Sequence, residues 1–375
     1  MTVPKTTKAV IVREAKSQNQ LIPEFKNDAV LRVDYPLPEL GPGKVLVKVA
    51  AVGFNHKDVW IRKGMYPRLK PESIFGGDGA GVVVASHDDK DDLINKRVFL
   101  VPSSGWKSKP TGPEDPKNFQ VLGCRQDEPS GTFAEYLVVD REQLIRTPDH
   151  LDDIQAAAWP LGGITAWRAA MINAGVQAGH NVLITGIGDG VALFALQFCV
   201  AAGANVYVTS GKTEKIQKAI ELGAKGGVNY KDENWPAQLQ TLLNKQGEGT
   251  KLDSVVDGAG GEILGKIKDS LQDGGRVVWY GMGAGPTVTM HMEQVLHNQQ
   301  LIGEFFERGC SGAELTQCAG STMGSHKDME DATAFISKHK IVPIVSHVIE
   351  GLDKFEQGFE LLYRSDQFGK VIIKV

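Results

Sequence analysis

A strand that runs through glycines into a helix is the feature that most limits how this chain can fold. The apolar segment 181–185 leads into the turn 186–192 and then into an apolar helical stretch at 193–202. In a βαβ unit, glycines in such a turn permit a tight bend and a close approach of backbone to a pyrophosphate. The free N–H groups of the helix start also favour phosphate. An ordinary strand-to-helix turn is the alternative, and the βαβ context favours a dinucleotide-binding loop.

The segments that follow alternate between apolar strands and helical stretches, which is typical of a parallel sheet covered on both faces. Six strands that alternate with helices in this way predict a doubly wound domain of the α/β class. The expected strands are 181–185, 205–210, 227–230, 252–257, 276–281 and 301–305.

Residues 30–160 have another pattern, in which short β-rich runs are separated by glycine and proline. This pattern predicts a twisted antiparallel or barrel-like domain. The last part of the chain is expected to return to that domain through a helix at 328–338, an extended segment at 342–348, a helix at 352–363 and a strand at 370–375.

A chain of 375 residues is long enough for two domains of roughly 150 residues each. We expect the first domain over 1–160, completed by 307–375, and the second over 161–306.

The charge balance excludes some classes of partner. The chain has 41 Lys and Arg against 45 Asp and Glu, a net charge of −4, and no long run of one sign. Nucleic acid and anionic membrane surfaces are therefore not expected as partners, which leaves small molecules and other protein chains. The first residues lack the apolar core of a secretory signal, and no membrane span is predicted, so a cytoplasmic protein is expected.

The end of the second predicted strand indicates which nucleotide is preferred. An Asp or Glu there would bind both ribose hydroxyls of NAD, whereas this chain has Ser210 followed by Lys212 and Lys215. A hydroxyl and ammonium groups suit a 2′-phosphate, so NADPH is the expected cofactor. The alternative to a phosphate site is that these residues form the solvent-exposed start of a helix. Glu214 could also still face the ribose.

An acidic residue, Asp189, interrupts the glycine turn. Its charge would repel a pyrophosphate if the carboxylate pointed inward. We expect the carboxylate to point to solvent or to cap the following helix.

Several local motifs together resemble the medium-chain dehydrogenase/reductase superfamily. The resemblance covers nearly the whole chain and implies a GroES-like catalytic domain that precedes and follows a Rossmann domain. Its carriers are AVGFNHKD at 51–58, RKGMYP at 62–67, GGDGAG at 76–81, GTFAEY at 131–136, the glycine turn, and GKVII at 369–373.

The zinc ligands of this superfamily's alcohol dehydrogenases are missing. Asn55 stands where they have a Cys, Asp78 ends the segment where they have Gly-His-Glu, and their third ligand would fall near 160–161. The loop that would hold a structural zinc contains Cys124 alone. Because catalytic zinc needs three protein ligands, neither site is expected. His56 and Asp58 form a metal-like pair, for which a hydrogen-bonded pair is the alternative.

The pattern is closer to zinc-lacking members, which include quinone oxidoreductases and enone or enoyl reductases. The resemblance implies that Asn55 contacts the nicotinamide ribose, that Tyr66 lies near the substrate, and that Ser210, Lys215 and Tyr230 hold the 2′-phosphate. A half-buried turn aromatic is the alternative for Tyr66, and core packing the alternative for Phe305. The full expected cofactor set is Asn55, Gly186, Gly188, Gly190, Val191, Ser210, Lys215, Tyr230, Gly258, Gly281, Phe305 and Lys370.

These observations predict an NADPH-dependent oxidoreductase that transfers hydride to a quinone, enone or other activated carbonyl without metal, with Tyr66, Asn55 and His56 as candidate catalytic residues. A non-zinc alcohol dehydrogenase with a proton relay through His56 is a second hypothesis. A non-catalytic NADPH-binding sensor or scaffold is a third, because fold does not imply function. By analogy with related folds, we expect a homodimer formed by pairing of the edge strand 301–305.

Overall fold

The computed structural model describes residues 3–19, 21–66, 69–123, 131–281, 283, 285–303 and 323–375, and for 285–288 it describes the backbone. The chain divides into two compact units, Met1–Gly162 with Ser325–Val375, and Gly163–Gly324. Within the described ranges, no helix is both long and apolar enough to cross a membrane.

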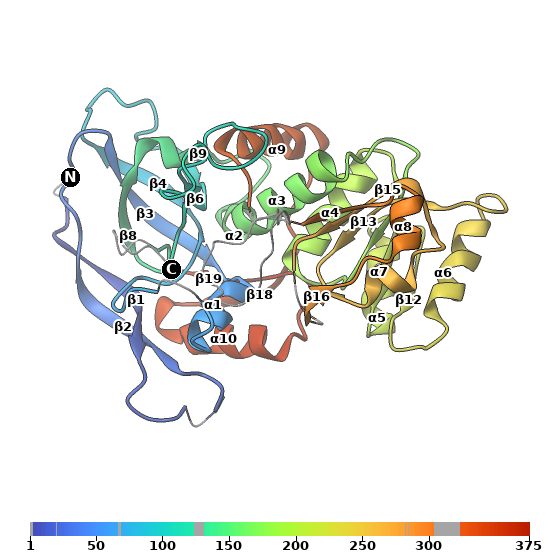
Figure 1. Ribbon diagram of the computed structural model, residues 1–375. Coiled ribbons are helices and arrows are strands. Elements are labelled where there is room, and N and C mark those ends of the chain that lie inside the picture. Colours follow the sequence, from blue (N-terminus) through green and yellow to red (C-terminus); the bar gives the residue numbers. More distant parts are fainter. Residues whose placement is uncertain are drawn as a thin grey trace. The chain divides into compact units, whose positions relative to one another are not determined.

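The first unit is built on a seven-stranded sheet in the order β18-β19-β3-β4-β5-β9, with β8 also paired to β3 (Figure 1). All its pairs are antiparallel except β18 with β19, as expected for this β-rich region. Its strands are β3 (Lys44–Gly53), β4 (Asp78–Ser86), β5 (Arg97–Leu100), β8 (Tyr136–Asp140), β9 (Leu144–Arg146), β18 (Val345–Glu350) and β19 (Lys370–Lys374).

Shorter ladders and helices complete this unit. β1 pairs with β2, and β6 pairs with β7. Their bounds are β1 (Thr6–Glu14), β2 (Asn27–Pro36), β6 (Ser103–Ser104) and β7 (Gln120–Val121), and the helices are α1 (His56–Arg62), α2 (Asp153–Ala158), α9 (His326–His339) and α10 (Phe355–Arg364). α3 (Pro160–Trp167) follows α2, and a π-helical turn continues it over Arg168–Asn173.

The late helix α10 packs against the early helix α1 around a cluster of aromatic rings. Phe359 makes edge contacts with Phe54 and Phe75, with 5.2 Å between ring centroids in each case. Gly358 makes room for this contact, because a Cβ there would lie 2.1 Å from a ring atom of Phe54. Buried Arg62, at the end of α1, forms an ion pair with Glu356 of α10 at 3.0 Å. These contacts fix α1, whose first turn carries candidate site residues.

The second unit contains a six-stranded parallel sheet in the order β12-β11-β10-β13-β15-β17. This is the 3-2-1-4-5-6 order of a doubly wound dinucleotide-binding sheet, which confirms the predicted fold class. The strands are β10 (Asn181–Ile184), β11 (Asn205–Ser210), β12 (Gly226–Asn229), β13 (Leu252–Asp257), β15 (Leu271–Trp279) and β17 (Gln300–Gly303).

Both faces of this sheet are covered. Successive strand side chains point to opposite faces, and Leu183 belongs to a core cluster with Trp235 and Leu239, while its neighbours Val182 and Ile184 are equally buried on the other face. The helices of the unit are α4 (Gly190–Ala201), α5 (Thr213–Glu221), α6 (Trp235–Asn244), α7 (Ile263–Lys266) and α8 (Met292–Leu296), and β14 (Gly260–Gly261) pairs with β16 (Gly285–Val288).

Candidate functional site

The glycine turn lies between β10 and α4, as predicted. Gly186 and Gly188 adopt φ angles of +66° and +131°, which L side chains rarely adopt. The turn is held against β11, since Gly186 N–H donates to Thr209 Oγ1 at 3.1 Å and Ile187 N–H donates to the Thr209 carbonyl at 2.9 Å. Apart from its chain neighbours, no described atom lies within 4 Å of where a Cβ of Gly186 would lie. This side of the turn is therefore open to a phosphate, and Gly190 and Val191 follow in the first turn of α4.

Asp189 caps α4, which confirms one of the two orientations expected for it. Its Oδ1 accepts a hydrogen bond from Ala192 N–H at 2.7 Å. The carboxylate is thereby fixed on the helix, and the Ala192 N–H is not available to a ligand.

Of the three residues expected to hold a 2′-phosphate, Ser210 and Tyr230 lie together at the carboxyl ends of β11 and β12, and Lys215 lies over the glycine turn. Tyr230 N–H donates to the Ser210 carbonyl at 3.2 Å. Lys215, on α5, extends over the glycine turn, with its Nζ 3.1 Å from where a Cβ of Gly188 would lie. Hydroxyl groups thus lie at the end of β11, an ammonium group lies over the glycine turn, and no carboxylate ends that strand.

The glycines at the ends of β13 and β15 pack against each other. A Cβ on Gly281 would lie 2.6 Å from the Gly258 carbonyl oxygen, and one on Gly258 would lie 2.6 Å from Tyr280 Oη. The structure therefore requires both glycines for packing of the two strand ends, in addition to the expected approach to a cofactor. Phe305 lies outside the described residues.

A buried carboxylate at the end of β13 was not predicted as a site residue. Asp257 accepts hydrogen bonds from Thr185 Oγ1 at 2.5 Å and from the N–H groups of Ala259 and Gly260 at 3.0 Å each. Burial raises the pKa of this carboxyl despite those donors. The contacts tie the β10 end to the β13 end, beside the glycine turn. Asp257 could have been selected from the sequence, because it is the last residue of the predicted strand 252–257.

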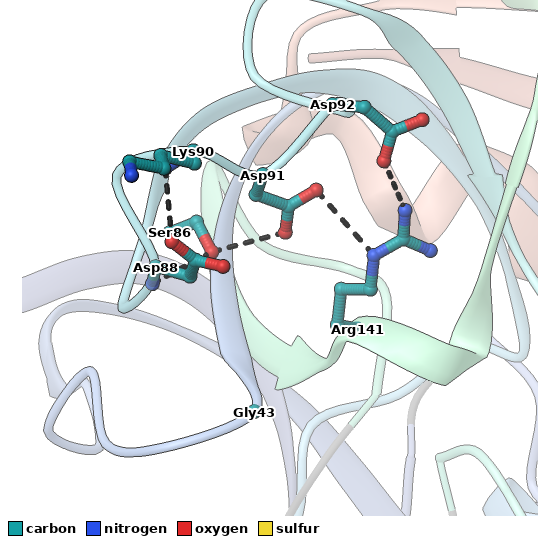
Figure 2. Close-up of a pocket in the computed structure, with 7 residues that line it drawn as sticks. All are labelled: Gly43, Ser86, Asp88, Lys90, Asp91, Asp92 and Arg141. Carbon is teal, nitrogen blue, oxygen red and sulfur yellow. Dashed lines mark hydrogen bonds and ion pairs between the residues drawn. The ribbon is translucent and has the colours of Figure 1, made fainter.

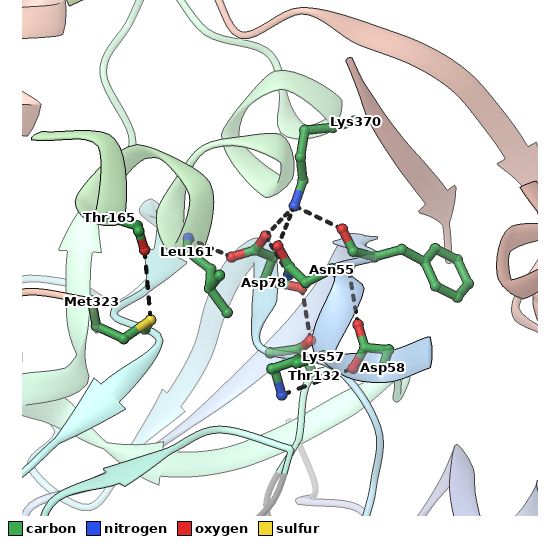
Figure 3. A network of polar contacts seen from close by, with 10 residues as sticks. Asn55, Lys57, Asp58, Asp78, Thr132, Leu161, Thr165, Met323 and Lys370 are labelled. Carbon is green, nitrogen blue, oxygen red and sulfur yellow. Dashed lines mark hydrogen bonds and ion pairs between the residues drawn. The ribbon is translucent and has the colours of Figure 1, made fainter. Parts of the chain in front are cut away.

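In the first unit, Asn55, Asp78 and Lys370 form one buried polar cluster (Figure 3). Lys370 Nζ donates to Asn55 Oδ1 and to the Phe54 carbonyl at 2.7 Å, and to Asp78 Oδ2 at 2.8 Å. Asn55 Nδ2 donates to the same Asp78 oxygen at 2.9 Å. The pairing of β19 with β3 places Lys370 here. The Asn55 amide is consequently held at both ends, with its second N–H left over.

Asp58 and Lys57 extend this cluster at the start of α1. Asp58 Oδ2 accepts a hydrogen bond from Asn55 N–H at 2.8 Å, and Lys57 Nζ donates to the Leu122 carbonyl at 2.6 Å. Burial raises the pKa of Asp58, although Lys57 and the Asn55 N–H favour its charged form. His56 is exposed, whereas the buried Asp58 carboxylate accepts a hydrogen bond from Asn55 N–H. His56 and Asp58 therefore do not form a metal site together.

Tyr66 follows α1 by a short turn and is partly buried against the core of the first unit. The packing matches the structural alternative considered for it and leaves part of its surface accessible.

Zinc does not fit the positions where the sequence pattern would place its ligands. Asp78 and Asn55 each receive the Lys370 ammonium, and Leu161, near the expected third ligand, donates its N–H to Asp78 Oδ1 at 2.7 Å. Zinc needs electron-pair donors, whereas Lys370 and Leu161 present hydrogens. In the part of the chain that the structure describes, no three His, Cys, Asp or Glu residues lie close enough to hold a metal ion. Cys124 lies outside that part.

A separate polar cavity of about 440 Å³ lies on the first unit, and its residues were not predicted as a site (Figure 2). Its charged groups bind one another: Arg141 pairs with Asp92 at 2.6 Å and with Asp91 at 3.4 Å, and Asp91 accepts from Ser86 Oγ at 3.0 Å. The sequence feature that could have indicated this cavity is the group of four Asp residues within 88–92. Because Arg141 is already bound by two of the carboxylates, we assign no chemistry to this cavity.

Comparisons with known proteins agree with the geometry. Residues 41–149 match the model of the alcohol dehydrogenase GroES-like domain, and 190–338 match that of the zinc-binding dehydrogenase family. The zinc-type alcohol dehydrogenase-like protein YogA of Leptosphaeria maculans is 38% identical over 362 residues, which cover 92% of this chain and 96% of the relative.

A second relative and a solved structure are also similar to this chain. Quinone oxidoreductase of Homo sapiens is 30% identical over 254 residues, 67% of this chain and 68% of that protein. The crystal structure of an NAD-dependent alcohol dehydrogenase superposes with a TM-score of 0.79 at 28% identity, covering 98% of this chain and 99% of the other.

Proposed function

This chain belongs to the medium-chain dehydrogenase/reductase superfamily, and from that premise we propose that it is a zinc-independent, NADPH-dependent reductase of quinones, enones or other activated carbonyls. Oxidoreductase chemistry is the established part, since the matching families and relatives are oxidoreductases. The cofactor preference, the independence from zinc and the substrate class are the proposal.

The observation that carries the proposal is the set of groups at the end of β11. Ser210 and Tyr230 lie at the strand end, where a carboxylate would be needed to bind the ribose hydroxyls of NAD, and Lys215 lies over the glycine turn. Ammonium and hydroxyl groups bind a phosphate through charge-assisted hydrogen bonds. The open backbone at Gly186 and the start of α4 fit the pyrophosphate. NADPH supplies the hydride when bound, and these residues hold and orient it.

Independence from zinc rests on the cluster in the first unit. The Lys370 ammonium takes the oxygens of Asn55 and Asp78, so a cation already neutralises the buried carboxylate. Charge that develops on a substrate oxygen then needs hydrogen-bond donors in place of a Lewis acid. The free N–H of Asn55 and the hydroxyl of Tyr66 are the candidate donors, with exposed His56 as a proton source.

The substrate class is supported by the similarity to human quinone oxidoreductase, while the relative YogA is named after alcohol dehydrogenases. A quinone or enone accepts hydride without prior activation by a metal, which agrees with the zinc-free cluster. An alcohol dehydrogenase that uses His56 and a non-catalytic NADPH binder are the competing functions.

The proposal is tested by calorimetric titration of chelator-treated protein with NADPH and NADH. A screen for NADPH oxidation by quinones and enones follows. We expect tight NADPH binding, weak NADH binding, and NADPH oxidation by quinones or enones that chelator treatment leaves unchanged. Lys215→Ala should weaken NADPH far more than NADH, with Lys218→Ala on the same helix as the matched control. Equal affinity for the two nucleotides, or activity that returns only with added zinc, would contradict the proposal. Binding without oxidation of any acceptor would indicate a sensor or scaffold.

The homodimer is also proposed, with β17 as the contact, because it is the edge strand of the six-stranded sheet. Met292, Val295 and Leu296 on the adjacent α8 are exposed, by 71%, 54% and 80%. An apolar surface beside a strand edge with which no described strand pairs favours association. Light scattering should give twice the mass of the chain, and Leu296→Asp should shift it toward the monomer.

A further inference from the structure

Gly211, directly after β11, is covered by two side chains that come from the end of β12. A Cβ at residue 211 would lie 2.8 Å from Tyr230 Oη and 2.9 Å from Lys231 Cε. Both distances are below ordinary van der Waals contact, so a residue with a side chain would displace one or both groups. Glycine at this position therefore lets the tyrosine hydroxyl and the lysine approach the end of β11 together.

The backbone after β12 sets this arrangement. β11 and β12 pair in parallel with Ser210 opposite Asn229. Tyr230 N–H then donates to the Ser210 carbonyl at 3.2 Å, and Lys231 N–H donates to Asn229 Oδ1 at 3.0 Å. These two bonds hold the start of the next turn against the end of β11, so Lys231 is directed across Gly211 by ordered backbone.

Lys215 comes from another element and lies beside the glycine turn, which hydrogen bonds to Thr209 hold against β11. It projects from α5 over the glycine turn, with Cδ and Nζ 2.8 and 3.1 Å from where a Cβ of Gly188 would lie. A phosphate monoester carries nearly two negative charges near neutral pH, which one ammonium does not balance. Lysines on two elements, with the hydroxyls of Ser210 and Tyr230, supply the charge and the donors for such a group.

We propose that Lys231 is a second cationic contact to the 2′-phosphate of NADPH and that Gly211 is the specificity-determining residue that admits it. This inference rests on the proposed function, in which NADPH is the cofactor. Lys231 was not among the residues predicted from the sequence. With this residue included, Lys215 and Lys231 together distinguish NADPH from NADH.

Two variants test the inference by different physical routes. Lys231→Gln removes the charge and keeps most of the side chain. Gly211→Ala keeps every charge but pushes the Tyr230 and Lys231 tips away. Because those tips are exposed, and residue 211 has no positive φ angle, the fold should tolerate the alanine. Lys225→Gln, at an exposed position at the amino end of β12, is the matched control.

Calorimetric titration with NADPH, NADH, 2′,5′-ADP and ADP gives the readout, without turnover. Lys231→Gln and Gly211→Ala should each weaken NADPH and 2′,5′-ADP roughly fivefold to tenfold and leave NADH and ADP unchanged. The dependence of NADPH affinity on salt should also become shallower in Lys231→Gln, because one ionic contact is lost. Melting temperatures should match those of the Lys225→Gln control.

The outcomes separate failure of the inference from failure of the proposed function. If wild type prefers NADPH and Lys215→Ala removes that preference, but both new variants behave like Lys225→Gln, the inference is wrong and the proposed function stands. Equal weakening of NADPH and NADH in Lys231→Gln would also overturn the inference, since the lysine would then serve the whole nucleotide. If wild type does not distinguish NADPH from NADH, the proposed cofactor is wrong and the inference falls with it.

Discussion

The ammonium of Lys370 lies 2.8 Å from Oδ2 of Asp78, and both side chains are buried although 292 residues separate them in sequence. Two charges are removed from water here, and each is stabilised by the other and by further hydrogen bonds. Such a pair is strongly destabilised when one partner is lost, because the other is left buried and uncompensated.

Lys370→Met should therefore lower the free energy of unfolding by about 3–5 kcal/mol. The double variant Lys370→Met with Asp78→Asn should recover part of that loss, since no unpaired charge remains. Lys374→Met, on the same strand, is the control, because its pair with Glu350 is exposed and should contribute less than about 1 kcal/mol. Urea unfolding followed by circular dichroism measures all four. A loss in Lys370→Met no larger than in the control would show that the pair is not charged.

Asp58→Asn should change how stability depends on pH. Burial raises the pKa of Asp58, so the folded state binds its proton more tightly than the unfolded chain does. The wild type should therefore lose stability relative to Asp58→Asn as pH rises above the ordinary Asp value of about 4, and the difference should level off above the raised pKa. Denaturant titrations of both proteins from pH 4 to 8 measure it. The opposite slope would mean that Lys57 outweighs burial.

Asp189→Asn should keep the helix cap and strengthen cofactor binding. Asn caps helices about as well as Asp, so the hydrogen bond from Ala192 N–H is retained. Removal of a negative charge beside the glycine turn should raise the affinities for NADPH and NADH by the same factor. Asp189→Ala, by comparison, should cost about 1 kcal/mol of stability. Calorimetry and thermal melts separate the two effects, and weaker binding in Asp189→Asn would show that the carboxylate helps to order the turn.

Tyr66→Phe should lower kcat for a verified quinone or enone while leaving the melting temperature nearly unchanged, because the ring packing is retained and only the hydroxyl is lost. Tyr363→Phe is the control, since Tyr363 is also partly buried against the same core. Steady-state kinetics with saturating NADPH provide the measurement. An unchanged kcat in Tyr66→Phe would assign this residue to packing alone.

The second unit could be predicted closely because its signals are local. The strands at 205–210 and 252–257 have the predicted bounds, and those at 181–185 and 227–230 differ by one residue at one or both ends. The strand predicted at 276–281 runs over Leu271–Trp279, and the one predicted at 301–305 begins at Gln300, with 304–305 outside the described residues. The Asp189 cap was also predictable, since a cap involves residues three positions apart. Alternation of strand and helix, with glycine at the first turn, leaves few other topologies.

The contacts of the first unit could not be predicted in the same way. Asn55 was expected to face a nicotinamide ribose, but the helix α1 that it caps was not predicted, and its amide orientation depends on Lys370, 315 residues away. Lys231 was missed because only the fold brings the end of β12 against Gly211. Such pairings follow from strand register, which no local pattern encodes.

The pairing of β19 with β3 also orders events during synthesis. Residues 163–324 lie wholly inside the chain between the two parts of the first unit, and they can collapse on their own as they leave the ribosome. The amino-terminal strands must meanwhile wait for β19, since Asp78 lacks its ion pair and Asn55 its hydrogen bond with Lys370 until that residue arrives. The nascent chain therefore carries an unfinished sheet edge for most of its translation, and this edge is where chaperone contact is to be expected.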